Sequence, residues 1–485
     1  MKRVLLITVA LVLVLIGVVL LRTSSLNSKQ LVVKPVEPIA FNDSALFGRF
    51  SEALCFRTIS EQDSMVNRNQ ELDRFKHFLA IRFPLVHKQL DCFTVNEHAL
   101  VYHWFGSNPE LLPVLLMAHQ DVVPAIDSAS WEHPPFAGAL DVTYIYGRGT
   151  LDDKSSVMGL LEAIEYLLST NRKPKRSVYL AFGFDEETGG LEGAIQEALW
   201  FQSKKMEFES VLDEGGTIVQ DVVPGVKAPV ALVGIAEKGY MTIELSVHTE
   251  GGHSSMPPPQ SAAGIIAAAV SRLEAEPFPA RLQGPLAQMF SYLAPEMDFG
   301  SRVAFANLWL LKNAVLSKMS KKNSTNAAIR TTTAVTVLKS GSKDNVLPSE
   351  ASALINFRLL QGDDSYSVME HVKQVVNDAR IQCKVKGRVK EASPVSDTNS
   401  EAFLLLNKTI REVFPEVLVA PYQVLAATDA YHFSSLSKQV FRFLPIRLGP
   451  EDLACIHGKD ERITKKNYLE MVRFYVRYIE HSAVN

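Results

Sequence analysis

Three apolar runs of strand length, each ending in acidic residues or a histidine, constrain the fold of this chain more than any other feature. They are LLPVLLMAH (111–119), RSVYLAFGFDEE (176–187) and SVLDEGG (210–216). Between the first two lies SSVMGLLEAIEYLL (155–168), whose apolar residues recur at helical spacing. Strands that alternate with helices predict an α/β domain with a mostly parallel central sheet. Because such sheets bind ligands at the carboxyl ends of their strands, we expect the functional site where these runs end.

A second, smaller unit interrupts this domain. From about Gly239 the chain reads as a strand, a helix, two strands, a helix and a strand, which is the ferredoxin-like order β-α-β-β-α-β. Residues 285–326 form an extra segment inside it, which we interpret as a helical hairpin. After about Ala392 the chain returns to the first domain. The sequence thus predicts an α/β domain built from 43–238 and 392–485, with an inserted α+β domain at 239–391.

The N-terminus carries an uncharged apolar run, Val4 to Leu21, preceded by Lys2 and Arg3. Its 18 residues, at 1.5 Å each, just cross a hydrocarbon core of about 30 Å. Residues 1–22 therefore fit a signal-anchor or a signal peptide, and the absence of a clear small-x-small cleavage site favours the anchor. The basic end should stay in the cytoplasm, which places the rest in an extracytoplasmic compartment, periplasmic, lumenal or secreted. Residues 23–42 read as a polar, proline-containing tether, and we expect membrane contact through this N-terminal segment only.

Composition argues against nucleic acid as a partner and does not decide whether the chain has a disulfide bond. The chain of 485 residues has 50 basic and 53 acidic residues, so it has no overall field that would attract nucleic acid. Its four cysteines show neither zinc-ribbon spacing nor the density of a disulfide scaffold. Whether any of them forms a disulfide stays open.

Two pairs of polar residues have both a structural and a functional interpretation. His119 and Asp121 lie at positions i and i+2 of a strand end, so their side chains face the same side. Asp121 could then orient a metal-bound imidazole, although an ordinary strand-end pair explains the fragment equally well. Asp152 and Asp153, taken alone, are better explained as an N-cap and a first-turn acid of the following helix.

Other acids favour a metal or an acid–base role. Asp185, Glu186 and Glu187 follow one strand directly, and their mutual repulsion is costly unless cations neutralise it. Asp213 and Glu214 repeat the arrangement after the next strand. His457 is a distant residue that could close a metal site, although taken alone it would normally be a surface or a core histidine. Several carboxylates with two histidines and no cysteine ligand suit one or two zinc ions.

Six motifs, in order, resemble a known family. AHQDVVP, GRGTLDDK, DEETGG, LDEGG, GGHSSMPP and IHGKDERI are similar to those of the co-catalytic di-zinc metallopeptidases that include aminoacylase, carboxypeptidase S and glutamate carboxypeptidase. The resemblance runs from about residue 50 to the C-terminus. It is greatest to the carboxypeptidase S branch, which also contains secreted N-fatty-acyl-amino-acid synthase/hydrolases. For the inserted domain it implies a lid that also serves dimerisation.

The resemblance also implies roles for single residues. One zinc ion would be held by His119 and the acid of LDEGG, which is either Asp213 or Glu214. Glu187 and His457 would hold a second zinc ion, and Asp152 would bridge the two. Glu186 becomes the general base, and Asp121 orients His119.

Three lid residues would contact the substrate. His253 would donate to the oxyanion, from its own subunit or across a homodimer, with Asn345 assisting. Arg358, on an otherwise apolar strand, would bind a substrate carboxylate, although alone it would suggest a structural ion pair.

The expected function is therefore a metallo-carboxypeptidase or N-acyl-amino-acid amidohydrolase that uses two zinc ions per subunit. It would act on small peptides or N-acyl amino acids with a free carboxylate. The alternative is a catalytically silent binding or receptor module on the same fold, and the intact ligand and base positions argue against it. The apolar side chains of 285–326 could line an acyl-chain pocket, but lid core or a dimer interface is the favoured interpretation.

Overall fold

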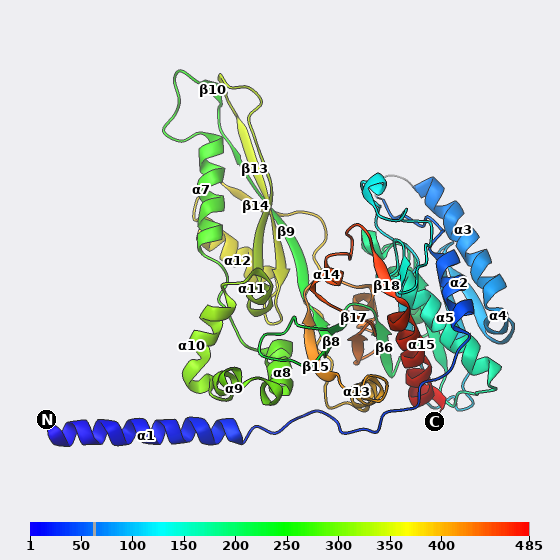
Figure 1. Ribbon diagram of the computed structural model, residues 1–485. Helices are drawn as coiled ribbons and strands as arrows, with labels where there is room; N and C mark the ends of the chain where they lie inside the picture. The colour runs from blue at the N-terminus through cyan, green and yellow to red at the C-terminus, as the bar shows by residue number, and fades with distance from the viewer. Residues whose placement is uncertain (62–64, 485) are drawn as a thin grey trace.

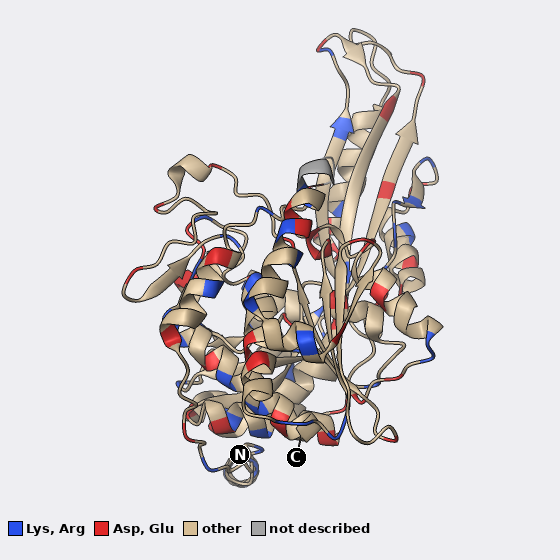
Figure 2. Ribbon diagram, turned by 90° about the vertical axis from the view of Figure 1, so that its right-hand side faces the viewer, with Lys and Arg blue, Asp and Glu red and all other residues tan. Residues whose placement is uncertain are grey.

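A computed structural model of the chain describes residues 1–61 and 65–484. The molecule has a large α/β body, a lid that rises from it, and one N-terminal helix that runs along the base (Figure 1). Basic and acidic residues are interspersed over the face in Figure 2, as the small net charge leads one to expect.

Ten of the described strands form the central sheet of the body. Their order is β1-β2-β5-β3-β6-β16-β8-β7-β17, and β15 pairs with β8 outside this path. The pairs β5–β3, β3–β6, β6–β16, β8–β15 and β7–β17 are parallel. The strands are Asp91–Val95 (β1), Ala99–Trp104 (β2), Val114–His119 (β3), Val178–Gly183 (β5), Ser210–Asp213 (β6), Ile218–Val219 (β7), Val230–Glu237 (β8), Leu418–Val424 (β15), Val440–Arg442 (β16) and Arg447–Leu448 (β17). The predicted fold class, a mostly parallel α/β sheet, is confirmed.

Both faces of this sheet are covered, which explains why the strands read as continuous apolar runs. Along β3, Leu116 packs into one hydrophobic cluster, whereas Leu115 and Met117 pack into the cluster on the opposite face. The helices of the body are Asp43–Ala53 (α2), Met65–Arg82 (α3), Pro84–Gln89 (α4), Lys154–Ser169 (α5), Ala194–Ser203 (α6), Glu401–Val413 (α13), Pro450–Leu453 (α14) and Lys465–Ile479 (α15). All five apolar residues that predicted one face of α5 are buried: Val157, Leu160, Leu161, Ile164 and Leu168.

The lid has the predicted ferredoxin-like order. Its four-stranded sheet runs β11-β13-β9-β14 with every neighbouring pair antiparallel. Helices α7 and α12 pack together and share a hydrophobic cluster with this sheet. The elements are Gly239–His248 (β9), Ala262–Ala275 (α7), Thr332–Ser340 (β11), Glu350–Leu359 (β13), Ser365–Val376 (α12) and Gln382–Val385 (β14). Two short strands, Gly252–His253 (β10) and Val346–Leu347 (β12), pair at the tip of the lid (Figure 1).

The extra segment inside the lid is helical, but it is not the hairpin that we interpreted from the sequence. It contains Gly284–Leu293 (α8), Phe299–Ala306 (α9), Leu308–Met319 (α10) and Asn323–Ile329 (α11). Asn307 separates α9 from α10 and Asp298 caps α9, so the segment bends several times. Helix α8 lies against β15 of the body.

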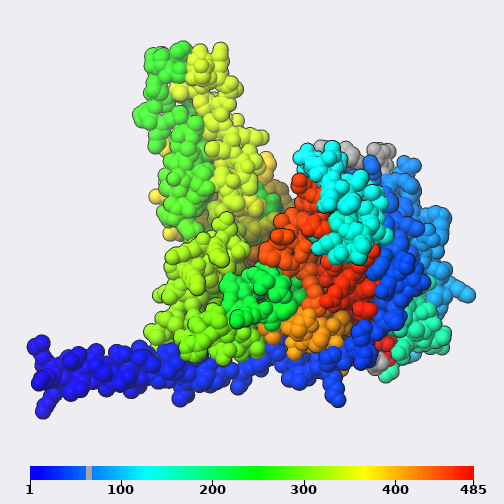
Figure 3. All heavy atoms as spheres, viewed as in Figure 1, coloured from blue at the N-terminus to red at the C-terminus, as the bar shows by residue number. Residues whose placement is uncertain are grey.

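The N-terminal helix α1 spans Lys2–Ser24 and lies against α9. Residues 25–41, part of the segment expected to be a tether, follow the base of the body (Figure 3). The Gln30 amide exchanges two hydrogen bonds with the backbone of Val419, and the Arg473 side chain donates to the Ile39 carbonyl. The four cysteines are free thiols.

Candidate metal centre

Three neighbouring strands deliver polar residues to one edge of the central sheet. Strand β3 ends at His119, β5 ends three residues before Glu186, and β6 ends at Asp213. Because β5, β3 and β6 are adjacent and parallel, their carboxyl ends lie side by side. Each of these strands is buried on both faces, so its residues are mostly apolar along its length. Polar residues are therefore concentrated where the strand ends.

Four of the predicted ligands converge at this edge. His119 Nε2 lies 2.8 Å from Asp152 Oδ1, and His457 Nε2 lies 3.0 Å from Asp152 Oδ2. His457 Nε2 is also 3.2 Å from Glu187 Oε2. One ligand atom each from His119, Asp152 and Glu187 lies within 4.8 Å of the others, so these three residues could hold a metal ion. A single carboxylate, that of Asp152, touches both imidazoles through its two oxygens.

Asp121 links the histidine to the glutamates. His119 Nδ1 donates to the Asp121 carbonyl at 3.0 Å and lies 3.4 Å from its carboxylate. The same carboxylate accepts hydrogen bonds from the Ser60 hydroxyl and from the backbone N–H groups of Glu186 and Glu187. Asp121 therefore fixes the ring of His119 and the turn that carries both glutamates, with Nε2 left to face Asp152.

A buried ion pair that was not predicted from the sequence joins the loops that carry Asp152 and His457. Arg148 Nη1 lies 2.6 Å from Glu461 Oε2, and both side chains are almost fully buried. Glu461 Oε1 accepts from the N–H of Leu151 at 2.7 Å, and Arg148 Nη2 donates to the Gly458 carbonyl at 2.9 Å. Strands Tyr144–Tyr146 (β4) and Arg462–Thr464 (β18) pair beside this contact. Arg148 stands in the motif GRGTLDDK and Glu461 in IHGKDERI, and these positions were the only indication of the pair in the sequence.

The electrostatics of the centre favour a cation. Burial raises the pKa of Glu186 and of Glu187, and Asp152 raises both further. The hydrogen bonds that His457 makes with Asp152 and Glu187 raise its pKa to about 10. Glu187 Oε1 is buried and has no hydrogen-bond partner in the described part of the chain. Such an excess of buried carboxylate oxygen is what a metal ion neutralises.

Both acids of LDEGG lie close to the centre. Asp213 is buried, and its two oxygens accept from the N–H groups of Glu214 and Ala430. Burial raises the pKa of Glu214, and the charges of Asp152, Asp213 and Glu186 raise it further. Asp429, from the segment Asp429–Phe433 (η4), is a further buried carboxylate here: burial and the charge of Asp213 raise its pKa.

The lid residues of the predicted site do not join this centre within one chain. His253 and Asn345 are exposed and lie together at the lid tip, where Ser254 N donates to the Asn345 carbonyl. Figure 1 shows this tip, labelled β10, far from the strand ends of the body. Arg358 lies on β13 near the base of the lid, with its guanidinium 4.9 Å from the centre of the Tyr240 ring.

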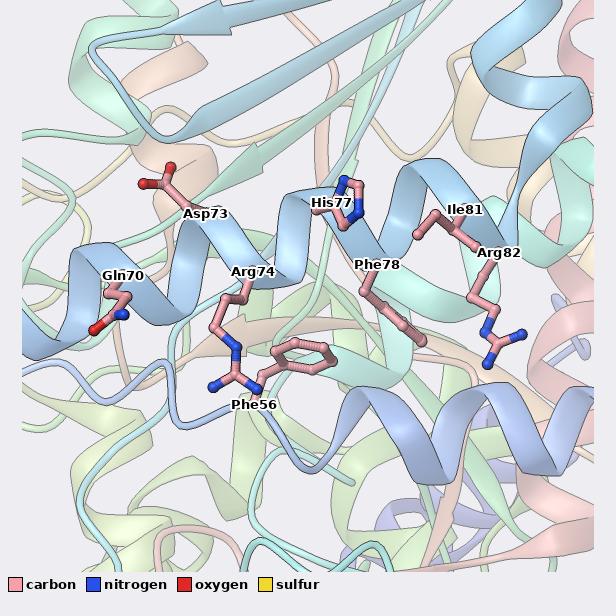
Figure 4. Close-up of a pocket in the computed structure, with 8 residues that line it drawn as sticks. All are labelled: Phe56, Gln70, Asp73, Arg74, His77, Phe78, Ile81 and Arg82. Carbon is pink, nitrogen blue, oxygen red and sulfur yellow. The ribbon is translucent and has the colours of Figure 1, made fainter.

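A surface hollow of about 600 Å³ lies elsewhere, along α3 (Figure 4). Phe56, Arg74, His77 and Phe78 are among the residues that line it. None of the predicted site residues is among those that line it, and it therefore adds no acid or imidazole to the group formed by His119, Asp152 and Glu187. We therefore place the candidate site at the strand ends.

Comparisons with known proteins bear on the family of the chain. The family profile described as "Peptidase family M20/M25/M40" matches residues 115–481. "Probable carboxypeptidase S-like 2" of Dictyostelium discoideum is 43% identical over 481 residues, which cover 96% of this chain and 92% of that protein. "N-fatty-acyl-amino acid synthase/hydrolase PM20D1" of Homo sapiens is 41% identical over 392 residues, covering 80% and 78%.

A solved structure shares the fold. The M20 family metallo-carboxypeptidase Sso-CP2 from Sulfolobus solfataricus matches with a TM-score of 0.65 at 18% identity, over 91% of this chain and 99% of that one. The relatives confirm the branch predicted from the motifs and the prediction of an enzyme. The chain belongs to peptidase family M20/M25/M40, a metal-dependent family of hydrolases.

Proposed function

We propose that this protein is a zinc-dependent hydrolase that cleaves the amide bond of small peptides or N-acyl amino acids with a free carboxylate. The observation that carries the proposal is the convergence of His119, Asp152, Glu187 and His457, which come from four separate segments. A carboxylate whose two oxygens face two different imidazoles suits a bridge between two ions.

The residues present fit two zinc ions per subunit. His119 with Asp213 or Glu214 would hold one ion, Glu187 with His457 the other, and Asp152 would bridge them. Nitrogen and oxygen ligands without cysteine are an ordinary donor set for catalytic zinc. The buried Glu187 Oε1, which has no hydrogen-bond partner among the described residues, supports a cation at this position. Bound zinc would polarise the substrate carbonyl and lower the pKa of a water molecule.

Glu186 is the general base of the proposed reaction. It sits beside the predicted ligands, and burial raises its pKa well above the ordinary value, which favours uptake of a proton by this carboxylate. Glu186 would take a proton from the attacking water and pass it to the nitrogen of the leaving amine. Asp121 would hold His119 in the tautomer that leaves Nε2 free for a metal.

The lid residues act in this proposal across a homodimer. The exposed position of His253 and Asn345 at the lid tip supports a role in the site of a second subunit. Arg358 would bind the substrate carboxylate. Mixing the variants Glu186→Gln and His253→Ala, each inactive alone, should restore part of the activity, because one site in a mixed dimer is complete. Activity that stays absent in mixtures shown to contain mixed dimers would refute the exchange.

The names of the relatives support the substrate class. The human relative is named an N-fatty-acyl-amino acid synthase/hydrolase, and the Dictyostelium relative is named a probable carboxypeptidase S-like protein. A panel of dipeptides, acetyl-amino acids and long-chain acyl-amino acids would separate the possibilities. Two zinc ions per subunit with turnover on one of these classes supports the proposal. Absence of bound metal and of turnover would favour the silent binding module.

Helix α1 is proposed to anchor the enzyme in a membrane, with the body outside the cytoplasm. It is long and apolar enough to cross a bilayer, with a mean hydropathy of 3.4, and the tested stretch is not buried against the body. Protease protection of the body in sealed vesicles or intact cells would test the location.

A further inference from the structure

Two exposed apolar side chains stand beside the end of α1. Trp309 and Leu310, in the first turn of α10, are 54% and 47% exposed. We call this pair the α10 surface. The helices that carry it are additions to the ferredoxin-like pattern, so the lid core does not explain them.

Asn307 connects the α10 surface to α1. Its side chain is fully buried and donates hydrogen bonds to the Val19 carbonyl at 3.3 Å and to the Thr23 hydroxyl at 3.2 Å. The indole N–H of Trp309 donates to Asn307 Oδ1 at 3.3 Å. Removing α1 as a cleaved signal peptide would expose Asn307 and take away two of its acceptors. The contact therefore supports an α1 that stays attached.

The length of α1 places this contact at the level of a bilayer surface. The uncharged run ends at Leu21, and the next residue is Arg22. Asn307 contacts α1 at Val19 and Thr23, on either side of that end. Figure 3 shows the N-terminal part of α1 projecting clear of the lid and the body. Trp309 would thus lie where an inserted α1 leaves the hydrocarbon, which is the depth that tryptophan prefers in membrane proteins.

The connection between α1 and the body is held in place. The Gln30 amide pairs with the Val419 backbone, Val36 N donates to the Glu412 carbonyl, and Arg411 donates to the Leu31 carbonyl. These bonds join the segment to α13 and β15. A bilayer that α1 enters would therefore meet the same part of the molecule each time.

We propose that the α10 surface rests on the phospholipid bilayer into which α1 inserts, with Trp309 and Leu310 at headgroup depth. The exposed Lys312, one helical turn after Trp309, and Arg22 at the end of α1 supply positive charge for the lipid phosphates. The proposal rests on the membrane insertion of α1 and not on the hydrolytic activity, so the two can fail separately.

Tryptophan fluorescence tests the proposal directly. The chain has four tryptophans, of which Trp104 and Trp131 are only 6% and 8% exposed, and Trp200 packs against Phe93. The full chain is reconstituted in phosphatidylcholine–phosphatidylglycerol vesicles whose acyl chains are brominated, with unbrominated vesicles as reference. We expect bromine to quench part of the emission, and Trp309→Phe to abolish that part. Full chain that does not float with the vesicles, or equal quenching in Trp309→Phe, would overturn the proposal.

A second variant separates docking from insertion. Asn307→Ala should still float with vesicles and hydrolyse substrate, but its Trp309 emission should be quenched less, because α10 is no longer fixed to α1. The matched control is Asn313→Ala, at an exposed position of the same helix. If the α10 surface instead contacts a second copy of the chain, wild-type Trp309 escapes bromine and Leu310→Asp lowers the oligomeric state. Either result contradicts docking on lipid.

Discussion

Removal of the Glu461 carboxylate should damage both the fold and the metal centre. Glu461 is fully buried, and its Oε2 pairs with Arg148 Nη1 at 2.6 Å. Its Oε1 accepts from the N–H groups of Leu151 at 2.7 Å and Gly149 at 3.1 Å. Glu461→Ala therefore leaves the Arg148 cation and two buried N–H groups without their acceptor. Breaking a buried ion pair on one side costs about 3–5 kcal/mol.

The loss should reach the metal through the two loops. Arg148 also donates to the carbonyls of Gly458 and His457, so the pair holds His457 beside Asp152. Removing groups that orient metal ligands typically lowers affinity about 10–100-fold, which corresponds to about 1.4–2.7 kcal/mol. We expect Glu461→Ala to lower the free energy of unfolding by about 3–5 kcal/mol and zinc affinity by that factor.

Denaturant unfolding of the metal-free protein and competition with a chelator measure the two effects separately. The double variant Arg148→Met, Glu461→Met should recover much of the stability, because neither charge is then left unpaired. It should recover less of the zinc affinity, since the N–H of Leu151 still lacks its acceptor. Wild-type zinc affinity in a folded Glu461→Ala protein would refute the argument that this pair positions the ligands.

Three further outcomes are expected. Glu186→Gln should keep its zinc, measured by elemental analysis, and lose about 10²–10⁴-fold in kcat, whereas loss of metal would make Glu186 a ligand instead. Zinc binding should release protons and tighten as pH rises from 6 toward about 10, because the pKa of free His457 is about 10; titration calorimetry in buffers of different ionisation enthalpy counts the protons. Burial lowers the pKa of His103 to about 4, whereas the ordinary value in the unfolded chain is about 6.5, so the unfolded chain binds the proton more tightly. The free energy of unfolding should therefore fall between about pH 6.5 and 4, by at most about 3.4 kcal/mol. His103→Phe should flatten that part of the stability profile, and His77→Gln, at an exposed position, should not.

Local patterns predicted those parts of the fold whose packing is set along the chain. The buried strands β3, β5 and β6 were readable because both faces are covered, which leaves apolar runs that end abruptly at polar residues. The ferredoxin-like lid was readable because its six elements follow one another. The helices of 284–329 were predicted as helical but not with their bends, since a bend depends on Asn307 and on α1, which lies almost 300 residues away in sequence.

The candidate ligands were predicted for a different reason. Each candidate ligand stands in a motif: His119, Asp152, Glu187 and His457. The sheet order explains why His119 and Glu187 lie close together, because β3 and β5 are adjacent and parallel. The Arg148–Glu461 pair was missed, although both residues lie in quoted motifs, because only the fold brings positions 313 residues apart into contact. A charged residue in a motif can bind the substrate, bind a metal or form an ion pair with another loop. Burial of both partners identifies an ion pair between loops.

The lid tip lies far from the candidate metal centre within one chain. His253 and Asn345 lie at the exposed lid tip, where β10 pairs with β12, and β9, which follows β8 along the chain, carries this tip away from the strand ends. A donor for the oxyanion must lie within hydrogen-bond reach of it. In the proposed mechanism His253 is that donor, and this arrangement keeps it away from the site of its own subunit. The proposal therefore requires either that His253 serves a partner's site or that the lid swings about the Glu237–Gly239 connection. Glu237 favours the first alternative: it is buried there and bonded to Arg442 and Thr428 of the body, which stiffens the connection.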